Sequence, residues 1–200
     1  MSKENNKLWG PERPTFTMES PATYPIFNSI TNNPIIGDER YFVKIGEINP
    51  QATNLSDSVV VTAGKKYLVY IYFHNNASST YNDSEHNRVG MALGTRLIAE
   101  FSDVVTPENE GILVASIISD NSNPSSIWCS VIMKSTTGDI HLNYVENSAR
   151  LLCDGAANKS LLSSSIFSDD GALLGIDELN GVIPGCEEYH GVVTFILQAE

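Results

Sequence analysis

The segment from Lys66 to Asn75 constrains the fold more than any other part of the sequence. Its side chains alternate in character with a period of two, and both resulting faces are apolar or aromatic. One face holds Tyr67, Val69, Ile71 and Phe73, and the other holds Leu68, Tyr70 and Tyr72. Successive side chains of a β-strand point to opposite sides of the sheet, so a strand with two apolar faces is covered on both sides. We therefore expect a central β-strand here.

The same period of two recurs along most of the chain beyond residue 40. Strong alternation predicts strands at 111–119, 127–134, 139–145 and 191–199, and weaker patterns predict strands at 41–48, 58–62, 91–101 and 149–153. No helical stripe of apolar residues extends beyond about a turn. About nine or ten short strands separated by polar turns are typical of an all-β, antiparallel β-sandwich.

The first forty residues have a different character. Five prolines exclude a helix or a central strand there, because proline fixes φ and has no amide hydrogen to donate: Pro11, Pro14, Pro21, Pro25 and Pro34. The segment also carries large apolar residues that a free linker would not need: Trp9, Phe16, Met18, Tyr24, Ile26, Phe27 and Ile30. We expect residues 1–40 to form an extended arm that packs on its own or a neighbouring domain, and residues 41–200 to form the sandwich.

The charge of the chain excludes one class of partner. The formal net charge is −12 and only 12 residues are Lys or Arg, whereas nucleic-acid binding needs clustered cations. Cationic partners, divalent metals and neutral glycans remain open, and acidity by itself favours solubility. No apolar run is long enough to span a membrane, and the first residues do not resemble a signal peptide. Either the protein stays inside the cell or the chain is a mature segment of a secreted protein with an added Met, and we favour the second.

Three cysteines occur at long spacings that do not suit a zinc site. Cys129 alternates with Ile127 and Val131, which predicts a thiol that faces the core. Cys153 and Cys186 lie beside turn signals, and we expect these two to form a disulfide.

Two stretches resemble a known family. The sequence VTAGKKY at 61–67, followed by YIYFHNNA at 70–77, resembles the V-x-P-G-K-x-Y entry into Ig-like repeat domains of bacterial and archaeal surface proteins, with Ala63 in place of the common proline. The sequence LNYVENSA at 142–149 is similar to their L-x-Y-V-x-G-S stretch, with Asn147 in place of glycine. The resemblance covers roughly residues 55–150. It implies an Ig-like sandwich at the cell surface or outside the cell, and it brings no catalytic residues.

Further short motifs are similar to those of uncharacterised secreted bacterial proteins. They are WGPERP at 9–14, FNSITNNP at 27–34 and GVIPGC at 181–186. These motifs again imply an extracellular β-sandwich.

Few residues form a pattern that points to chemistry. The four histidines form no metal-binding motif, and His74 is expected to hydrogen-bond a turn at the end of the central strand. No nucleophile elbow or phosphate-binding loop is present, so we expect a protein that is not an enzyme, and a hydrolase with scattered catalytic groups is the less favoured alternative. Acidic loops with glycine suit Ca²⁺, which prefers oxygen ligands; the candidate ligands are Asp169, Asp170 and Asp177.

These observations predict a structural or adhesive surface module. Its partners would be further copies of itself or other surface proteins, and the arm could add as a strand to the open sheet edge of a neighbour. The alternative is a module that binds calcium or a glycan, the glycan lying on the aromatic strip Tyr70, Tyr72 and Tyr144. Such aromatic residues also serve as ordinary cross-strand packing.

Overall fold

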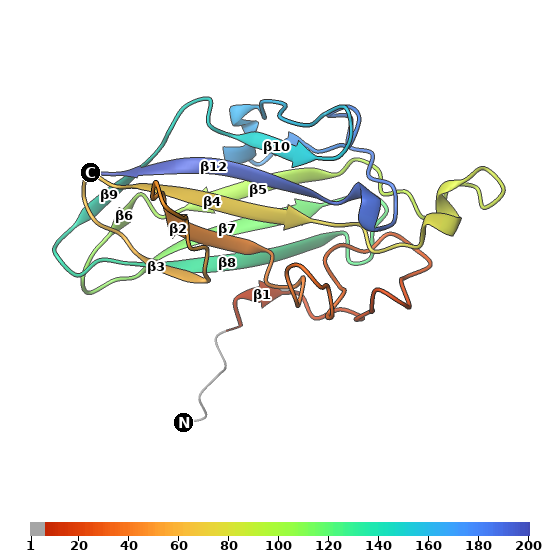
Figure 1. Ribbon diagram of the computed structural model, residues 1–200, viewed down its shortest axis with the longest axis horizontal. Helices are drawn as coiled ribbons and strands as arrows, with labels where there is room; N and C mark the ends of the chain where they lie inside the picture. The colour runs from red at the N-terminus through yellow and green to blue at the C-terminus, as the bar shows by residue number, and fades with distance from the viewer. Residues whose placement is uncertain (1–6) are drawn as a thin grey trace, which may run out of the picture.

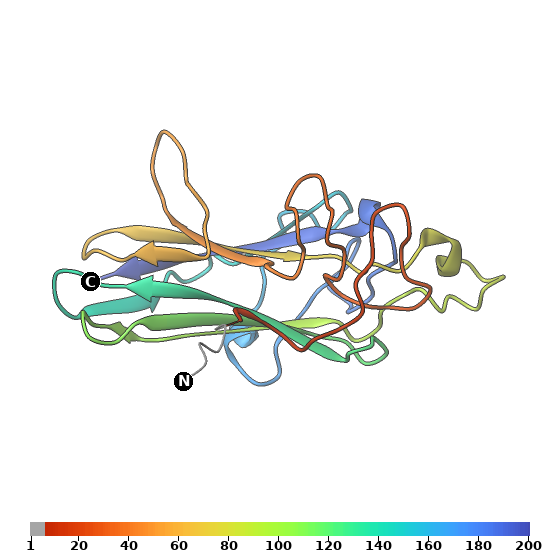
Figure 2. The same cartoon turned by 90° about the horizontal axis from the view of Figure 1, so that it is seen from below.

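Two β-sheets packed face to face form the molecule (Figures 1 and 2). The computed structural model describes residues 7–200, apart from the side chain of Glu187, so the first six residues of the expected arm lie outside the description. One sheet has the order β1-β8-β7-β5-β11, with β3 beside β8. Its strands are β1 (Trp9–Gly10), β3 (Ser58–Val60), β5 (Arg96–Phe101), β7 (Gly111–Ile118), β8 (Ser126–Lys134) and β11 (Ala172–Leu173).

The second sheet has the order β2-β4-β12-β9-β6, with β10 beside β12. Its strands are β2 (Val43–Glu47), β4 (Lys66–Phe73), β6 (Val104–Val105), β9 (Ile140–Tyr144), β10 (Arg150–Cys153) and β12 (Gly191–Ala199). β4 lies between β2 and β12 and pairs with both along most of its length. The expected central strand is therefore confirmed.

The core lies between the two sheets, as the alternating pattern predicts. In β12 every second side chain is buried, and in β8 the Cys129 thiol faces the core as expected. The regular helical turns of residues 7–200 are three short 3₁₀ segments, η1 (Ser79–Asn82), η2 (Ser164–Phe167) and η3 (Glu187–Tyr189). None of the helices in this part of the chain is long and apolar enough to cross a membrane. The expectation of an all-β sandwich of two layers is thus confirmed.

The number of strands differs from the expected nine or ten. The described residues contain twelve strands, and three of them, β1, β6 and β11, have two residues each. A pair of residues cannot display a period of two, so the sequence pattern could not reveal these strands. The pairing is antiparallel except between β3 and β8, which run parallel.

The arm packs on its own domain, which was one of the two expected arrangements. Trp9 and Gly10 form β1 beside β8, and Gly10 is needed there because a Cβ would lie 2.8 Å from the ring of Trp128. From there the arm, drawn in red and orange, runs past one end of the sandwich (Figure 2). Ile26 and Phe27 are fully buried. Trp9 and Phe27 of the arm therefore contribute to the same core as the strands.

Candidate functional site

The segment that follows β4 is polar and yet buried. His74, Asn75 and Asn76 are each no more than 1% exposed. Their backbone groups bond to the arm: the amide of Asn28 donates to the His74 carbonyl at 3.1 Å, and the amide of Asn76 donates to the Ile26 carbonyl at 2.8 Å. The arm therefore covers this segment and holds three polar side chains inside the protein.

The carboxylate of Glu39, which is fully buried, lies at the centre of these side chains. One oxygen accepts the Asn33 amide at 2.8 Å and lies 2.8 Å from Nδ1 of His74, and the other accepts the Asn76 amide at 2.7 Å. The Tyr72 hydroxyl approaches the first oxygen at 3.5 Å. A buried carboxylate is tolerated only when its oxygens are paired in this way. Glu39 thus joins the arm to the end of β4.

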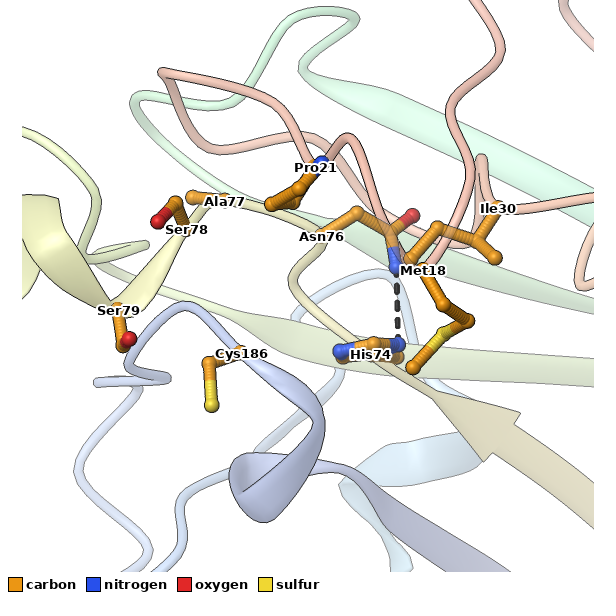
Figure 3. Close-up of a pocket in the computed structure, with 9 residues that line it drawn as sticks. All are labelled: Met18, Pro21, Ile30, His74, Asn76, Ala77, Ser78, Ser79 and Cys186. Atoms are coloured by element: carbon orange, nitrogen blue, oxygen red, sulfur yellow. Dashed lines mark hydrogen bonds between the residues drawn. The ribbon is translucent and has the colours of Figure 1, made fainter.

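Two polar groups approach Nδ1 of the His74 ring. A Glu39 oxygen lies 2.8 Å from this nitrogen, whose role as donor or acceptor depends on the ring tautomer. The Asn76 amide nitrogen lies 2.9 Å from the same Nδ1 (dashed line in Figure 3), and this amide is oriented by its carbonyl oxygen, which accepts the backbone amide of Ser29. The second ring nitrogen, Nε2, is buried. Within the described residues this buried atom has no hydrogen-bond partner.

A pocket of about 240 Å³ lies against this ring. It is lined by the arm, by the segment after β4 and by the loop before β12, which contribute among others Met18, Ile30, His74, Asn76, Ser79 and Cys186. Figure 3 shows the second ring nitrogen of His74 on the side of Cys186, away from Asn76, and the thioether of Met18 beside the ring. The pocket therefore gathers an imidazole, a thiol and a thioether from three separate parts of the chain.

The loop that carries Cys186 is held in a strained conformation. Cys186 has a φ of 111°, which L-residues rarely adopt and which is enriched at functional sites. Its amide donates to the Asn75 carbonyl at 3.2 Å. Gly185, directly before Cys186, forms two hydrogen bonds with the side chain of Asn82. The Asn82 amide donates to the Gly185 carbonyl at 2.7 Å, and its oxygen accepts the Gly185 amide at 2.9 Å. These contacts fix the position of the thiol.

Two arginines, Arg13 and Arg40, contact Trp9 at the start of the arm. The Arg13 guanidinium is buried and donates to the Asn28 carbonyl at 2.8 Å, and it lies 5.4 Å from the ring of Trp9. Burial, helped by the nearby Arg40, lowers the pKa of Arg13 to about 10. Arg40 also stacks on Trp9, at 4.4 Å, and pairs with Asp38 at 2.6 Å. Burial raises the pKa of Asp38, but the hydrogen bonds from Arg40 outweigh it and the net pKa lies below its usual value.

The structure does not contain the expected disulfide between Cys153 and Cys186. All three cysteines are free thiols. The sulfur of Cys153 lies 3.4 Å from the Ile176 carbonyl, whereas Cys186 faces the pocket beside His74. The two turns that carry them thus direct their thiols to different surroundings.

The three aspartates expected to bind calcium are all exposed. Asp169 and Asp170 lie in the turn before β11, and Asp177 accepts the backbone amide of Ala156 at 3.2 Å. Among residues 7–200 no three His, Cys, Asp or Glu side chains come together in a way that could hold a metal ion. The calcium site therefore stays a prediction without geometric support.

The seven apolar residues expected to serve as an assembly arm are mostly used inside the domain. Trp9, Ile26, Phe27 and Ile30 are buried, and Phe16, Met18 and Tyr24 are half-buried. The arm residue Ile35, which the sequence did not single out, is instead 75% exposed. It borders a groove of about 360 Å³ on the outer face of β2 and β4, lined among others by Tyr41, Lys44, Leu55 and Tyr70.

The reactivity of the thiols gives a direct check of this arrangement. Burial raises the pKa of Cys129 to about 11, so its thiolate is scarce at neutral pH and is also shielded. We expect iodoacetamide at pH 8 to spare Cys129 in the folded protein and to modify all three cysteines in guanidinium, as measured by peptide mass mapping. Cys153, only half-buried, serves as the internal control. Equal rates at Cys129 and Cys153 would contradict the burial of Cys129.

Comparison with known proteins adds no relative. No family model matches the chain, and neither a curated protein nor a solved structure matches it.

Proposed function

We propose that this chain is an extracellular adhesive module with an Ig-like β-sandwich, and that it recognises a protein through the groove beside Ile35. The first partner to consider is a second copy of the chain. The observation that carries this proposal is the aliphatic and aromatic character of the groove, since Ile35, Tyr41 and Leu55 are all exposed there. Large exposed apolar patches on soluble proteins mark interaction sites.

The shape of this face suits a symmetric contact. Ile35 projects as an apolar knob, with three quarters of its surface exposed, and the groove beside it offers apolar walls. A knob and a hollow on one face can match those of a second copy related by a two-fold axis. Tyrosine, which lines the groove at positions 41 and 70, is enriched at such interfaces.

Strand addition by the arm is the less favoured route to assembly. It would require Ile26, Phe27 and the hydrogen bonds of Asn28 to leave the domain. The groove needs no such rearrangement, because Ile35, Tyr41 and Leu55 already face solvent. We therefore place the contact between copies at the groove.

Light scattering after size exclusion tests this proposal. The net charge of −12 opposes association of identical chains, and salt screens this repulsion. We expect the full chain to form dimers at high protein concentration. Dimers should form more readily in about 0.5 M salt than in about 0.05 M salt, because this change shortens the screening length about three-fold. Ile35→Asp should abolish the dimer. Val89→Asp, at another exposed apolar residue, in the loop after η1, should leave it intact.

A glycan is the second candidate for the same groove. Tyr41 and Tyr70 line the groove, and Lys44 pairs with Tyr70 across β2 and β4 and lies 5.7 Å from the ring of Tyr41. A monomer at every concentration would reject self-association, and binding to a glycan array that is lost in Tyr41→Ala would then favour the carbohydrate. A monomer without glycan binding would reject both.

A further inference from the structure

We propose that a second pocket, where the chain crosses from one sheet to the other, binds a small quaternary ammonium ion such as choline. The crossing is made by Ser102 and Asp103, which connect β5 in the first sheet to β6 in the second. The proposal is independent of the groove beside Ile35, because no residue lines both sites. The pocket has a volume of about 390 Å³ and is lined by Ala99, Glu100, Phe101, Asp103, Tyr144 and Phe167.

Three half-buried aromatic rings line the pocket, and they come from three separate elements. Phe101 ends β5, Tyr144 ends β9 and Phe167 ends η2. The ring of Phe167 lies 5.9 Å from that of Phe101 at an interplanar angle of 85°, and 4.6 Å from that of Tyr144 at 55°. Phe167 also packs at 5.3 Å on the fully buried Phe195, and the Tyr144 hydroxyl accepts the amide of Ala149 at 3.3 Å. Steeply inclined rings around one hollow resemble the aromatic cages that recognise quaternary ammonium groups.

The rings of this pocket have no cationic side chain as a partner in residues 7–200. The cation–π contacts in that part of the chain involve only Trp9 and Tyr41, which lies beside it. The positive charges near the start of the arm are therefore used elsewhere. The aromatic surface of the pocket remains available to a cation from solution.

The charge at the pocket also favours a cation. Glu100 and Asp103 are exposed, and neither forms an ion pair within the described part of the chain. Glu110, by contrast, has a basic partner in Lys134, at 2.9 Å. Charges on residues that line a pocket act on an ion inside it with little screening, because the Debye length in physiological salt is about 8 Å. The net charge of −12 adds a general attraction for cations.

A quaternary ammonium group suits this pocket better than a primary ammonium group does. It has no N–H donor, so none of its atoms loses a hydrogen bond when it leaves water for the aromatic walls. The ammonium of lysine is compact and strongly hydrated, and its three N–H donors would lose water at such walls. Negative charge at the rim also disfavours ligands that carry a carboxylate or phosphate. The expected ligand is therefore a quaternary ammonium ion without an anionic group.

Ligand-observed NMR of choline with the full chain tests the proposal. We expect saturation transfer from the protein to the N-methyl protons of choline. The affinity for choline should be about two- to thirty-fold higher than for its uncharged analogue, in which a tert-butyl group replaces the trimethylammonium group. Glycine betaine, which carries a carboxylate, should bind more weakly than choline. Absence of transfer to choline, or equal affinities for choline and either of the other compounds, would overturn the proposal.

Two pairs of variants locate the site. Phe167→Leu keeps the apolar packing but removes a ring, and it should lower the affinity for choline about five- to ten-fold; Phe16→Leu, at a half-buried aromatic residue outside the pocket, is the matched control. Asp103→Asn should lower the affinity about two- to five-fold, whereas Asp170→Asn, at an exposed aspartate elsewhere, should not change it. Circular dichroism confirms that each variant is folded, and the comparison of ligands on the wild type needs no variant. If either control lowered the affinity as much as its partner, the pocket would not be the binding site.

Discussion

We expect the substitution Glu39→Leu to lower the free energy of unfolding by about 3–5 kcal/mol, the usual cost of removing one partner from a buried charged network. The carboxylate serves Asn33, His74 and Asn76 at distances of 2.7–2.8 Å. Leucine fills similar space but makes no hydrogen bond, so three buried polar groups would lose a partner, and each unsatisfied group is costly. In a domain of this size the melting temperature should fall by roughly 10 °C.

Two further variants separate the roles of the carboxylate. Glu39→Gln keeps one acceptor oxygen and the shape of the side chain. Its free energy of unfolding should therefore lie between that of the wild type and that of Glu39→Leu. Glu47→Leu is the matched control on β2, where the carboxylate is partly exposed and pairs with Lys65 at 2.9 Å. Exposed ion pairs contribute about 0–1 kcal/mol. If both leucine variants melted alike in differential scanning calorimetry, Glu39 would not be the centre of the network.

The strands of the sandwich were predictable because side-chain alternation is a local property. The segment with two apolar faces, expected at Lys66–Asn75, became β4, which ends earlier, at Phe73. The pattern at 191–199 became β12 with the same boundaries. The expected strand at 91–101 begins five residues late, at Arg96, because Gly94 at the turn before it has a φ of 60°. The formation of two-residue strands such as β1 depends on pairing with residues far along the chain. Such strands are too short to show an alternating pattern in the sequence.

The polar network was not predictable for a related reason. Glu39 lies in the sequence Gly-Asp-Glu-Arg, which is typical of an exposed turn. Its burial follows from the packing of the arm over the end of β4, which is a long-range contact. The one local sign is the sequence His-Asn-Asn directly after an apolar strand, which predicts hydrogen bonding to a turn. The position of Cys186 in the pocket likewise depends on the arrangement of three loops.

The substitution Phe27→Ala should destabilise the whole domain by about 3–5 kcal/mol, as expected for a large side chain removed from a packed core. Phe27 is 1% exposed and belongs to the same core as residues of both sheets. Phe16→Ala is the matched control, because Phe16 is a half-buried arm residue whose ring meets only the edge of Tyr24, at 6.3 Å, in the described aromatic contacts. Chemical denaturation of the three proteins provides the measurement.

The form of the transition decides whether the arm is a separate element. If the arm is part of the core, the fluorescence of Trp9, isolated by the Trp128→Phe substitution, and the far-UV circular dichroism should change at the same denaturant concentration, as in two-state unfolding. Because Trp9 lies in β1 beside β8 and Phe27 bridges to Asn75, release of the arm would expose core from both sheets. An earlier change at Trp9 would instead show an arm that detaches from a stable sandwich, which would restore strand addition as the route to assembly.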